Sequence, residues 1–308
     1  MQSTTTTVTA SDGIALHTNR WLPAGPAQGV VQIAHGLGEH SGRYARLAEA
    51  LTAAGYAVYA HDHRGHGATA NDADHGFFAD RDGWATVVED LRAVTRFAQE
   101  ENPGLPVFLL GHSMGSYLAR CYVIENSRDL AGLVLSATGG DPGWLGKVGP
   151  LVARTEARLR GRRHVSTLLQ GLLNGPYNGA FKPNRTSFDW LSRDEAEVDK
   201  YVADELCGRT ATSSFFVDLG TGVAQCNDRR QVARVRRDLP VLIVSGQRDP
   251  SGHDGAGPLA VSEQYSSVGV ADVTCTLYPE ARHEIFNETN RDEVTADLIA
   301  WLDAHLPA

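Results

Sequence analysis

Residues 107–115 have the sequence Val-Phe-Leu-Leu-Gly-His-Ser-Met-Gly, and this stretch decides the fold. Its four leading apolar residues predict a buried strand, and the apolar pattern after Met114 predicts a helix running to Glu125. The residues between them match G-x-S-x-G, in which small residues let a strand turn sharply into a helix and expose the serine hydroxyl. We therefore expect Ser113 to be a nucleophile, the alternative being an ordinary strand-to-helix turn.

Similar apolar runs recur along the chain and predict the strands of a sheet. Helical patterns separate most of these runs, and alternating strands and helices predict a mainly parallel sheet with helices on both faces, an α/β fold. Two further β-prone runs, Thr5–Ala10 and Ile14–Trp21, flank Ser11-Asp12-Gly13 and predict a hairpin at one edge of the sheet. The predicted parallel strands are Val30–Ala34, Tyr56–Ala60, Val107–Leu110, Leu133–Ser136, Val241–Ser245 and Val273–Leu277.

The alternation breaks between Ser136 and Val241, a gap too long for one crossover. We interpret residues 141–225 as an inserted cap (lid), rich in glycine, proline and aromatic residues, and residues 1–140 with 226–308 as the core domain. The cap is also electrostatically distinct. Between Lys147 and Arg193 it holds nine basic and two acidic residues, whereas the whole chain carries a net charge of −9.

Composition excludes several classes of protein. The negative net charge argues against a nucleic-acid partner, which needs many Lys and Arg contacts to phosphate. No run reaches the roughly 18 apolar residues of a membrane span, and Met1–Ala10 is polar, unlike a secretion signal. The four cysteines are scattered without C-x-x-C spacing, which predicts neither a structural zinc site nor a disulfide framework. We expect a cytoplasmic protein.

A serine nucleophile needs a base within hydrogen-bond reach and a carboxylate behind that base. Asp249 follows the predicted strand Val241–Ser245 after a short turn, which is where such a fold places the acid. The alternative is an ordinary turn aspartate before Pro250. The histidines that remain after it are His253, His283 and His305. We expect His283 to be the base, because it lies on a loop between the last predicted strand and the last helix, and His253 to be a surface or cap-facing residue.

The oxyanion that forms on an attacked carbonyl needs two hydrogen-bond donors. His35-Gly36-Leu37-Gly38 follows the strand Val30–Ala34, and the backbone N–H groups of Leu37 and Met114 would face each other across the nucleophile. The alternative is a plain turn.

A histidine-rich segment, Asp62-His63-Arg64-Gly65-His66-Gly67, follows His61 and suggests zinc at first sight. Its spacing is not the helical i, i+4 of metal ligands. We expect a structural loop in which Asp62 and Arg64 bond neighbouring backbone, and no metal.

Four separated motifs occur along the chain in the order 35–44, Gly111–Gly115, Gln247–Asp249 and Arg282–Glu284. Together they resemble the monoacylglycerol lipase and lysophospholipase group of α/β-hydrolases, and the resemblance extends from Thr5 to the last helix. The resemblance implies an α/β-hydrolase fold, a triad of Ser113, Asp249 and His283, and oxyanion donors at Leu37 and Met114. Residues 188–194 also resemble the cap of bacterial lysophospholipases.

Together these features predict a serine ester hydrolase that releases fatty acid from a small lipid ester, monoacylglycerol, without a cofactor. Alternatives are a lysophospholipase, a general carboxylesterase, acyl transfer, peptide-bond hydrolysis near an amino terminus, and a non-catalytic ligand-binding protein on the same scaffold. The basic, amphipathic segment Leu151–Arg163 predicts peripheral contact with a lipid interface; the alternative is a solvated cap helix. Candidate substrate-binding residues are Gly36, His112, Trp144, Leu172 and Tyr177.

Overall fold

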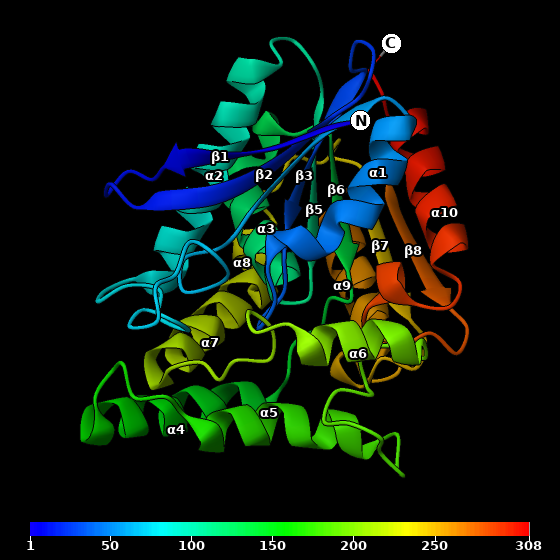
Figure 1. Cartoon of the computed structure of the whole chain (residues 1–308). Coiled ribbons are helices and arrows are strands. Elements are labelled where there is room, and N and C mark those ends of the chain that lie inside the picture. The colour runs from blue at the N-terminus through cyan, green and yellow to red at the C-terminus, as the bar shows by residue number, and fades with distance from the viewer. Residues whose placement is uncertain (308) are drawn as a thin grey trace.

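The computed structural model describes residues 1–307, and at residues 144–147 it describes the backbone alone. Within these residues eight strands form one sheet in the order β1-β2-β4-β3-β5-β6-β7-β8 (Figure 1). Each predicted strand is present, and its ends lie within three residues of the predicted ones. The strands are β1 (Gln2–Thr9), β2 (Ala15–Leu22), β3 (Gly29–Ala34), β4 (Tyr56–His61), β5 (Val107–His112), β6 (Gly132–Ser136), β7 (Val241–Gly246) and β8 (Val273–Tyr278).

The sheet is antiparallel at one edge and parallel elsewhere. The β1–β2 hairpin pairs Val8 with Leu16, and β2 runs antiparallel to β4. From β4 to β8 all neighbours are parallel. Strands β3, β4, β5, β6 and β7 are buried along their whole length, which explains their continuous apolar runs. The predicted edge hairpin and parallel sheet are confirmed.

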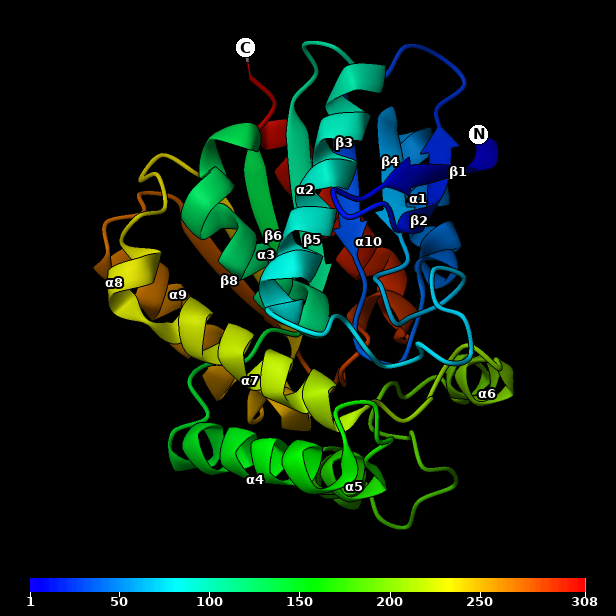
Figure 2. The same ribbon diagram turned by 90° about the vertical axis from the view of Figure 1, so that its left-hand side faces the viewer.

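Helices cover both faces of the sheet (Figures 1 and 2). Helices α1 (Ala45–Ala53) and α10 (Arg291–Ala304) bury apolar side chains against one face. Helices α2 (Gly83–Glu101), α3 (Met114–Asn126) and α9 (Ala256–Ser267) bury theirs against the other. Over the described residues 1–307, four short 3-10 helices lie in the loops: η1 (Ser41–Tyr44), η2 (Ser127–Asp129), η3 (Pro250–Gly252) and η4 (Ile285–Asn287).

The insertion between β6 and β7 is helical and gathers at the end of the sheet where the parallel strands terminate (Figure 1). Side-chain caps begin four of its helices: Ser166, Asp194, Thr212 and Asp228 accept backbone N–H bonds at the starts of α5, α6, α7 and α8. Its helices are α4 (Trp144–Arg160), α5 (Thr167–Gly179), α6 (Glu195–Ala203), α7 (Ser213–Asn227) and α8 (Arg229–Val232).

Helix α7 joins the insertion to the core. The Cys121 thiol on α3 donates to the Gly222 carbonyl on α7, with sulfur and oxygen 3.4 Å apart. Gly222 packs so closely on Trp84 of α2 that a Cβ there would lie 1.9 Å from the indole ring. Helices α4 and α5 lie farther from the sheet (Figure 2). The division at residues 141 and 225 stays a prediction.

Candidate active site

Ser113 stands at a strained turn between β5 and α3. Its backbone has φ 51° and ψ −117°, in the positive-φ region that non-glycine residues rarely adopt. The Ser113 N–H donates to the Ser136 carbonyl of β6 at 2.9 Å, which holds the turn in place. Gly115 is required by close approach to β3, because a Cβ there would lie 2.0 Å from the Ala34 carbonyl oxygen. Local strain is typical of a residue held for a function.

The structure brings Ser113, His283 and Asp249 into one hydrogen-bonded chain. His283 Nε2 lies 2.9 Å from Ser113 Oγ, and His283 Nδ1 lies 2.9 Å from Asp249 Oδ2. The three residues come from the ends of β5, from the loop after β8 and from the loop after β7. Asp249 is 0% and His283 3% exposed, so water has little access to the bond between them.

Ser251 belongs to this group, although the sequence analysis did not single it out. Its N–H and its hydroxyl both donate to Asp249 Oδ1, at 2.9 and 2.8 Å, and its hydroxyl lies 3.0 Å from His283 Nδ1. The available signal was local: an aspartate often accepts from the residue two positions on. Ser251 thus leaves Oδ2 of Asp249 for the imidazole.

The electrostatics of the pair make His283 a stronger base than a free imidazole. Burial opposes protonation of His283, but the Asp249 charge and its hydrogen bond outweigh burial and raise the imidazole pKa above its ordinary value. Burial would also raise the pKa of Asp249, whereas the facing His283 and the Ser251 donors lower it overall. Asp249 is therefore ionised at neutral pH.

The predicted oxyanion residues flank the serine. Gly36 lies against it, since a Cβ on Gly36 would be 3.2 Å from Ser113 Cβ, and Leu37 follows directly. Met114 is the first residue of α3, so its N–H is one of the donors that a helix start leaves without an internal partner. Within the described residues, neither the Leu37 nor the Met114 N–H donates to a protein acceptor. Both are free for a ligand oxygen.

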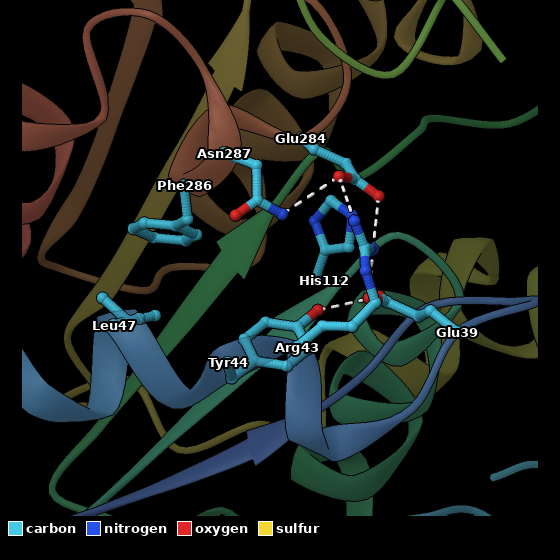
Figure 3. A pocket seen from close by; sticks show the side chains of 8 residues that line it. All are labelled: Glu39, Arg43, Tyr44, Leu47, His112, Glu284, Phe286 and Asn287. Carbon is cyan, nitrogen blue, oxygen red and sulfur yellow. Dashed lines mark hydrogen bonds and ion pairs between the residues drawn. The ribbon is translucent and has the colours of Figure 1, made fainter. Parts of the chain in front are cut away.

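A buried ion cluster ties the loop of Gly36 to the loop of His283 (Figure 3). Arg43 bonds Glu39 at 2.8 Å and binds Glu284 with two nitrogens, at 2.6 and 2.7 Å. Glu39 Oε1 in turn accepts from the Gly36 N–H at 2.6 Å. Burial would raise the pKa of Glu39, but Arg43 above all holds it at about 2.

His112 borders the small pocket that Figure 3 draws beside this cluster. Its ring centroid lies 5.0 Å from that of His283, and its Nδ1 lies 3.0 Å from Ser136 Oγ. Burial, and secondarily the charge of His283, lower the pKa of His112 to about 4, so its ring is neutral.

The other predicted pocket residues have different outcomes. Tyr177 approaches the centre through Trp190, whose ring stacks on Tyr177 at 5.1 Å and on His283 at 4.6 Å between centroids. Leu172 is 62% exposed on α5, which disagrees with a place in a substrate pocket. The side chain of Trp144 lies outside the described residues.

The histidine-rich segment forms a buried structural loop. Asp62 accepts from the backbone N–H groups of Ser41 and Ala68, both at 2.7 Å, as predicted for a loop-stabilising residue. The prediction for Arg64 was wrong in its partners: the guanidinium binds the Asp90 and Asp12 carboxylates instead of neighbouring backbone. His253 is exposed in its loop, in agreement with the prediction.

One group among the described residues has the composition of a metal site, and it lies elsewhere. The ligand atoms of His40, Asp204 and Cys207 lie within 4.8 Å of one another. However, His40 Nδ1 accepts from the Gly42 N–H, so the imidazole proton lies on Nε2 and faces Asp204 at 2.9 Å. That proton occupies the position a metal would need, and we treat the pair as a structural hydrogen bond.

In the described part of the chain no helix is long and apolar enough to cross a bilayer.

Comparison with known proteins agrees with this geometry. Residues 25–290 match the family described as Serine aminopeptidase, S33. The chain is 30% identical to a monoacylglycerol lipase of Mycolicibacterium smegmatis, covering 96% of this chain and 95% of that protein. It is also 30% identical to a human monoglyceride lipase, covering 90% and 82%. A solved carboxyl esterase of Bacillus coagulans, in complex with glycerol, superposes with a TM-score of 0.92 at 28% identity over the whole of both chains.

Proposed function

The chain belongs to the serine aminopeptidase S33 family of α/β-hydrolases, and from this we propose that it is a serine ester hydrolase that releases fatty acid from monoacylglycerol. The observation that carries the proposal is the hydrogen-bonded chain from Ser113 through His283 to Asp249. A non-catalytic binding protein on this scaffold would not need these three groups intact and aligned.

The reaction proceeds in two halves. His283 Nε2 takes the proton of Ser113 Oγ as that oxygen attacks the ester carbonyl, and the N–H groups of Leu37 and Met114 hold the oxyanion. The imidazolium then protonates the departing glycerol oxygen, which leaves an acyl group on Ser113. Water that gives its proton to His283 attacks this acyl-enzyme, and the fatty acid departs as Ser113 recovers its proton. Asp249 stabilises the imidazolium in both halves.

The family description names an aminopeptidase, but the site favours an ester. An enzyme that cleaves beside a free amino terminus needs a carboxylate available for the substrate ammonium group. The acidic side chains next to this centre, Glu39 and Glu284, already share the guanidinium of Arg43. The names of the similar monoglyceride lipases support monoacylglycerol as the substrate, and the similar esterase supports a general carboxylesterase as the second candidate.

A labelling experiment tests the nucleophile and a substrate panel tests the class. A fluorophosphonate probe should label the wild type and leave Ser113→Ala unlabelled. Initial rates on monoacylglycerols, lysophospholipids, p-nitrophenyl esters and amino-acid amides should be highest for monoacylglycerol. Labelling that survives the substitution contradicts the nucleophile, whereas faster cleavage of amides contradicts the ester preference.

We also propose that the outer face of α4 and α5 rests on a lipid interface. Large apolar side chains on it are open to water, among them Leu159, at 81% exposed, and Leu172. Several large apolar side chains exposed on two such helices favour a binding face. Arg154 and Arg158 lie exposed on α4, the helix that carries Leu159, and their positive charges would attract anionic lipid head groups. Two other arginines of the segment serve the core: Arg163 pairs with Asp74, and Arg162 donates to the Ala79 carbonyl.

Vesicle binding tests this face. Leu159→Gln should weaken sedimentation with anionic vesicles, and added salt should weaken it further. Ile14→Gln is the matched control, because Ile14 is an exposed apolar residue of the β1–β2 hairpin, away from the cap. Equal binding to neutral and anionic vesicles contradicts the role of the arginines.

All four cysteines are free thiols, which supports the cytoplasm as the location of the protein.

A further inference from the structure

A short segment of the insertion runs beside the loop that carries His283. We call residues 189–192, just before α6, the strap. The Glu284 N–H donates to the Leu191 carbonyl at 2.7 Å, and the His283 N–H donates to the Trp190 carbonyl at 3.4 Å. The Arg282 guanidinium reaches the carbonyls of Asp189 and Ser192. The strap therefore belongs to the catalytic centre, although it is far from His283 in sequence.

Trp190 places its ring against the imidazole. The two ring centroids are 4.6 Å apart and the planes meet at 41°. The backbone N–H of Trp190 donates to the Asn178 side chain at 3.2 Å, and the Tyr177 ring packs against the indole at 5.1 Å between centroids, so the ring has little freedom. This geometry lies within the roughly 6 Å at which an aromatic face attracts a cation.

The indole is retained at a cost. Its Nε1–H is buried and has no acceptor among the described residues. A buried donor without a partner destabilises a fold, and phenylalanine would avoid that penalty. Indole, however, offers the best aromatic face for a cation. A contact between the indole face and a positively charged imidazole would explain why a tryptophan stands here despite this cost.

We propose that Trp190 is a positioning residue that holds His283 in place and stabilises its protonated form. The inference rests on the proposed function, in which His283 carries a proton after each attack. The stability of the imidazolium also depends on the other titratable and charged groups around it. These are Glu39, Arg43, His112, Asp249, Arg282 and Glu284. The role of Trp190 must therefore be measured as a difference between variants that leave these groups unchanged.

Kinetics give the first measurement. Trp190→Leu removes the aromatic face and keeps the site apolar, so the low-pH limb of kcat/KM should move down by about 0.5 to 1 pH unit. The same loss should lower kcat about three- to tenfold. Trp190→Phe keeps a weaker face and should fall between Leu and the wild type. A purely structural role would lower kcat in both variants without moving the limb.

Fluorescence gives a second measurement that needs no substrate, because a protonated imidazole quenches an adjacent indole. The chain has five tryptophans, and Trp301 also stacks on a histidine, His305, at 4.2 Å. The experiment therefore uses a Trp301→Phe background, which should leave activity unchanged. Emission should fall as the pH drops through the kinetic pKa, and this step should vanish when Trp190→Phe or His283→Gln is added.

The outcomes separate cleanly. A shifted limb together with a fluorescence step that needs both Trp190 and His283 supports the proposal. An unmoved limb in Trp190→Leu overturns it, and so does a fluorescence step that persists in Trp190→Phe. If the protein hydrolyses no ester, the proposed function fails, and the fluorescence step alone still decides whether Trp190 senses the charge of His283. If Trp190→Leu does not fold, the Phe variant carries both measurements.

Discussion

Asp249 divides its two oxygens between two partners, and this division predicts unequal effects of substitution. Asp249→Asn would present an amide to His283 and favour the wrong tautomer, so kcat should fall about 10⁴-fold while the fold is kept. Ser251→Ala should cost far less, because the Ser251 N–H still donates to Asp249 Oδ1. Ester hydrolysis with circular dichroism as the folding control measures both. Equal losses in the two variants would contradict this assignment.

The pH profile follows from the base. Only neutral His283 can accept the Ser113 proton, and Asp249 raises the imidazole pKa against the opposing effect of burial. The rate should therefore be full at mildly alkaline pH and fall as the pH drops through a midpoint above the ordinary 6.5. Measuring kcat/KM from pH 5 to 9 checks this. A midpoint at or below 6.5 would mean that burial outweighs the carboxylate.

How far single residues can be predicted depends on whether a recognisable pattern marks their positions. The Ser113, Asp249 and His283 positions were predictable, because each follows a recognisable strand in a fixed order. Arg64 was not, because its carboxylate partners come from other elements at Asp12 and Asp90. Trp190 carried no signal of its own, since a lone aromatic residue in a cap looks the same whether it packs on a helix or on a base.

At the scale of elements, the turn from β5 into α3 depends on contact with β3. A Cβ on Gly115 would lie 2.0 Å from the Ala34 carbonyl oxygen and 2.7 Å from the His35 carbonyl oxygen, and backbone cannot move aside as a flexible side chain can. Gly115→Ala should thus lower the free energy of unfolding by about 2 kcal/mol or more. The matched control is Gly171→Ala in α5, where nothing lies within 4 Å and alanine should stabilise by about 0.5 to 1 kcal/mol. Urea unfolding measures the free energy of unfolding of both variants. Equal values for the two variants would contradict the close packing at Gly115.

The sheet was more predictable than the insertion for a physical reason. A strand buried on both faces is apolar along most of its length, so β3 and β7 can be recognised in the sequence as short apolar runs. Helical periodicity in α4 and α5 predicts an apolar face but not what that face meets, and the structure leaves Leu159 and Leu172 open to water. Sequence alone also could not predict the strap, because its hydrogen bonds with 282–284 use its own backbone carbonyls, which every residue carries.

At the scale of the whole molecule, buried histidines couple stability to acidity. Four of them gather where β3 and β4 end: the rings of His35 and His63 are 4.1 Å apart, with His61 and His66 alongside. Burial first, then the neighbouring His35, lowers the pKa of His61 and of His66 to about 3. The folded chain therefore keeps these rings neutral at pH values where an unfolded chain would protonate them.

The sign of the effect follows from linkage. Because these pKa values are depressed by folding, their contribution to stability is complete above about pH 6.5 and is lost as the pH falls through the folded values. His112, at about 4, acts in the same direction, whereas His283, whose pKa is raised, opposes them. Near pH 5 the rings of His61, His66 and His112 alone should take up about three protons on unfolding, because an unfolded histidine is almost fully protonated there. Urea unfolding between pH 7.5 and 5 measures that number as the slope of stability against pH, with His253→Gln, an exposed histidine, as the control that leaves the slope unchanged. A stability that stays flat over this range would mean that the four rings accept protons in the folded state, and that the loop between β4 and α2 opens to water well before the sheet does.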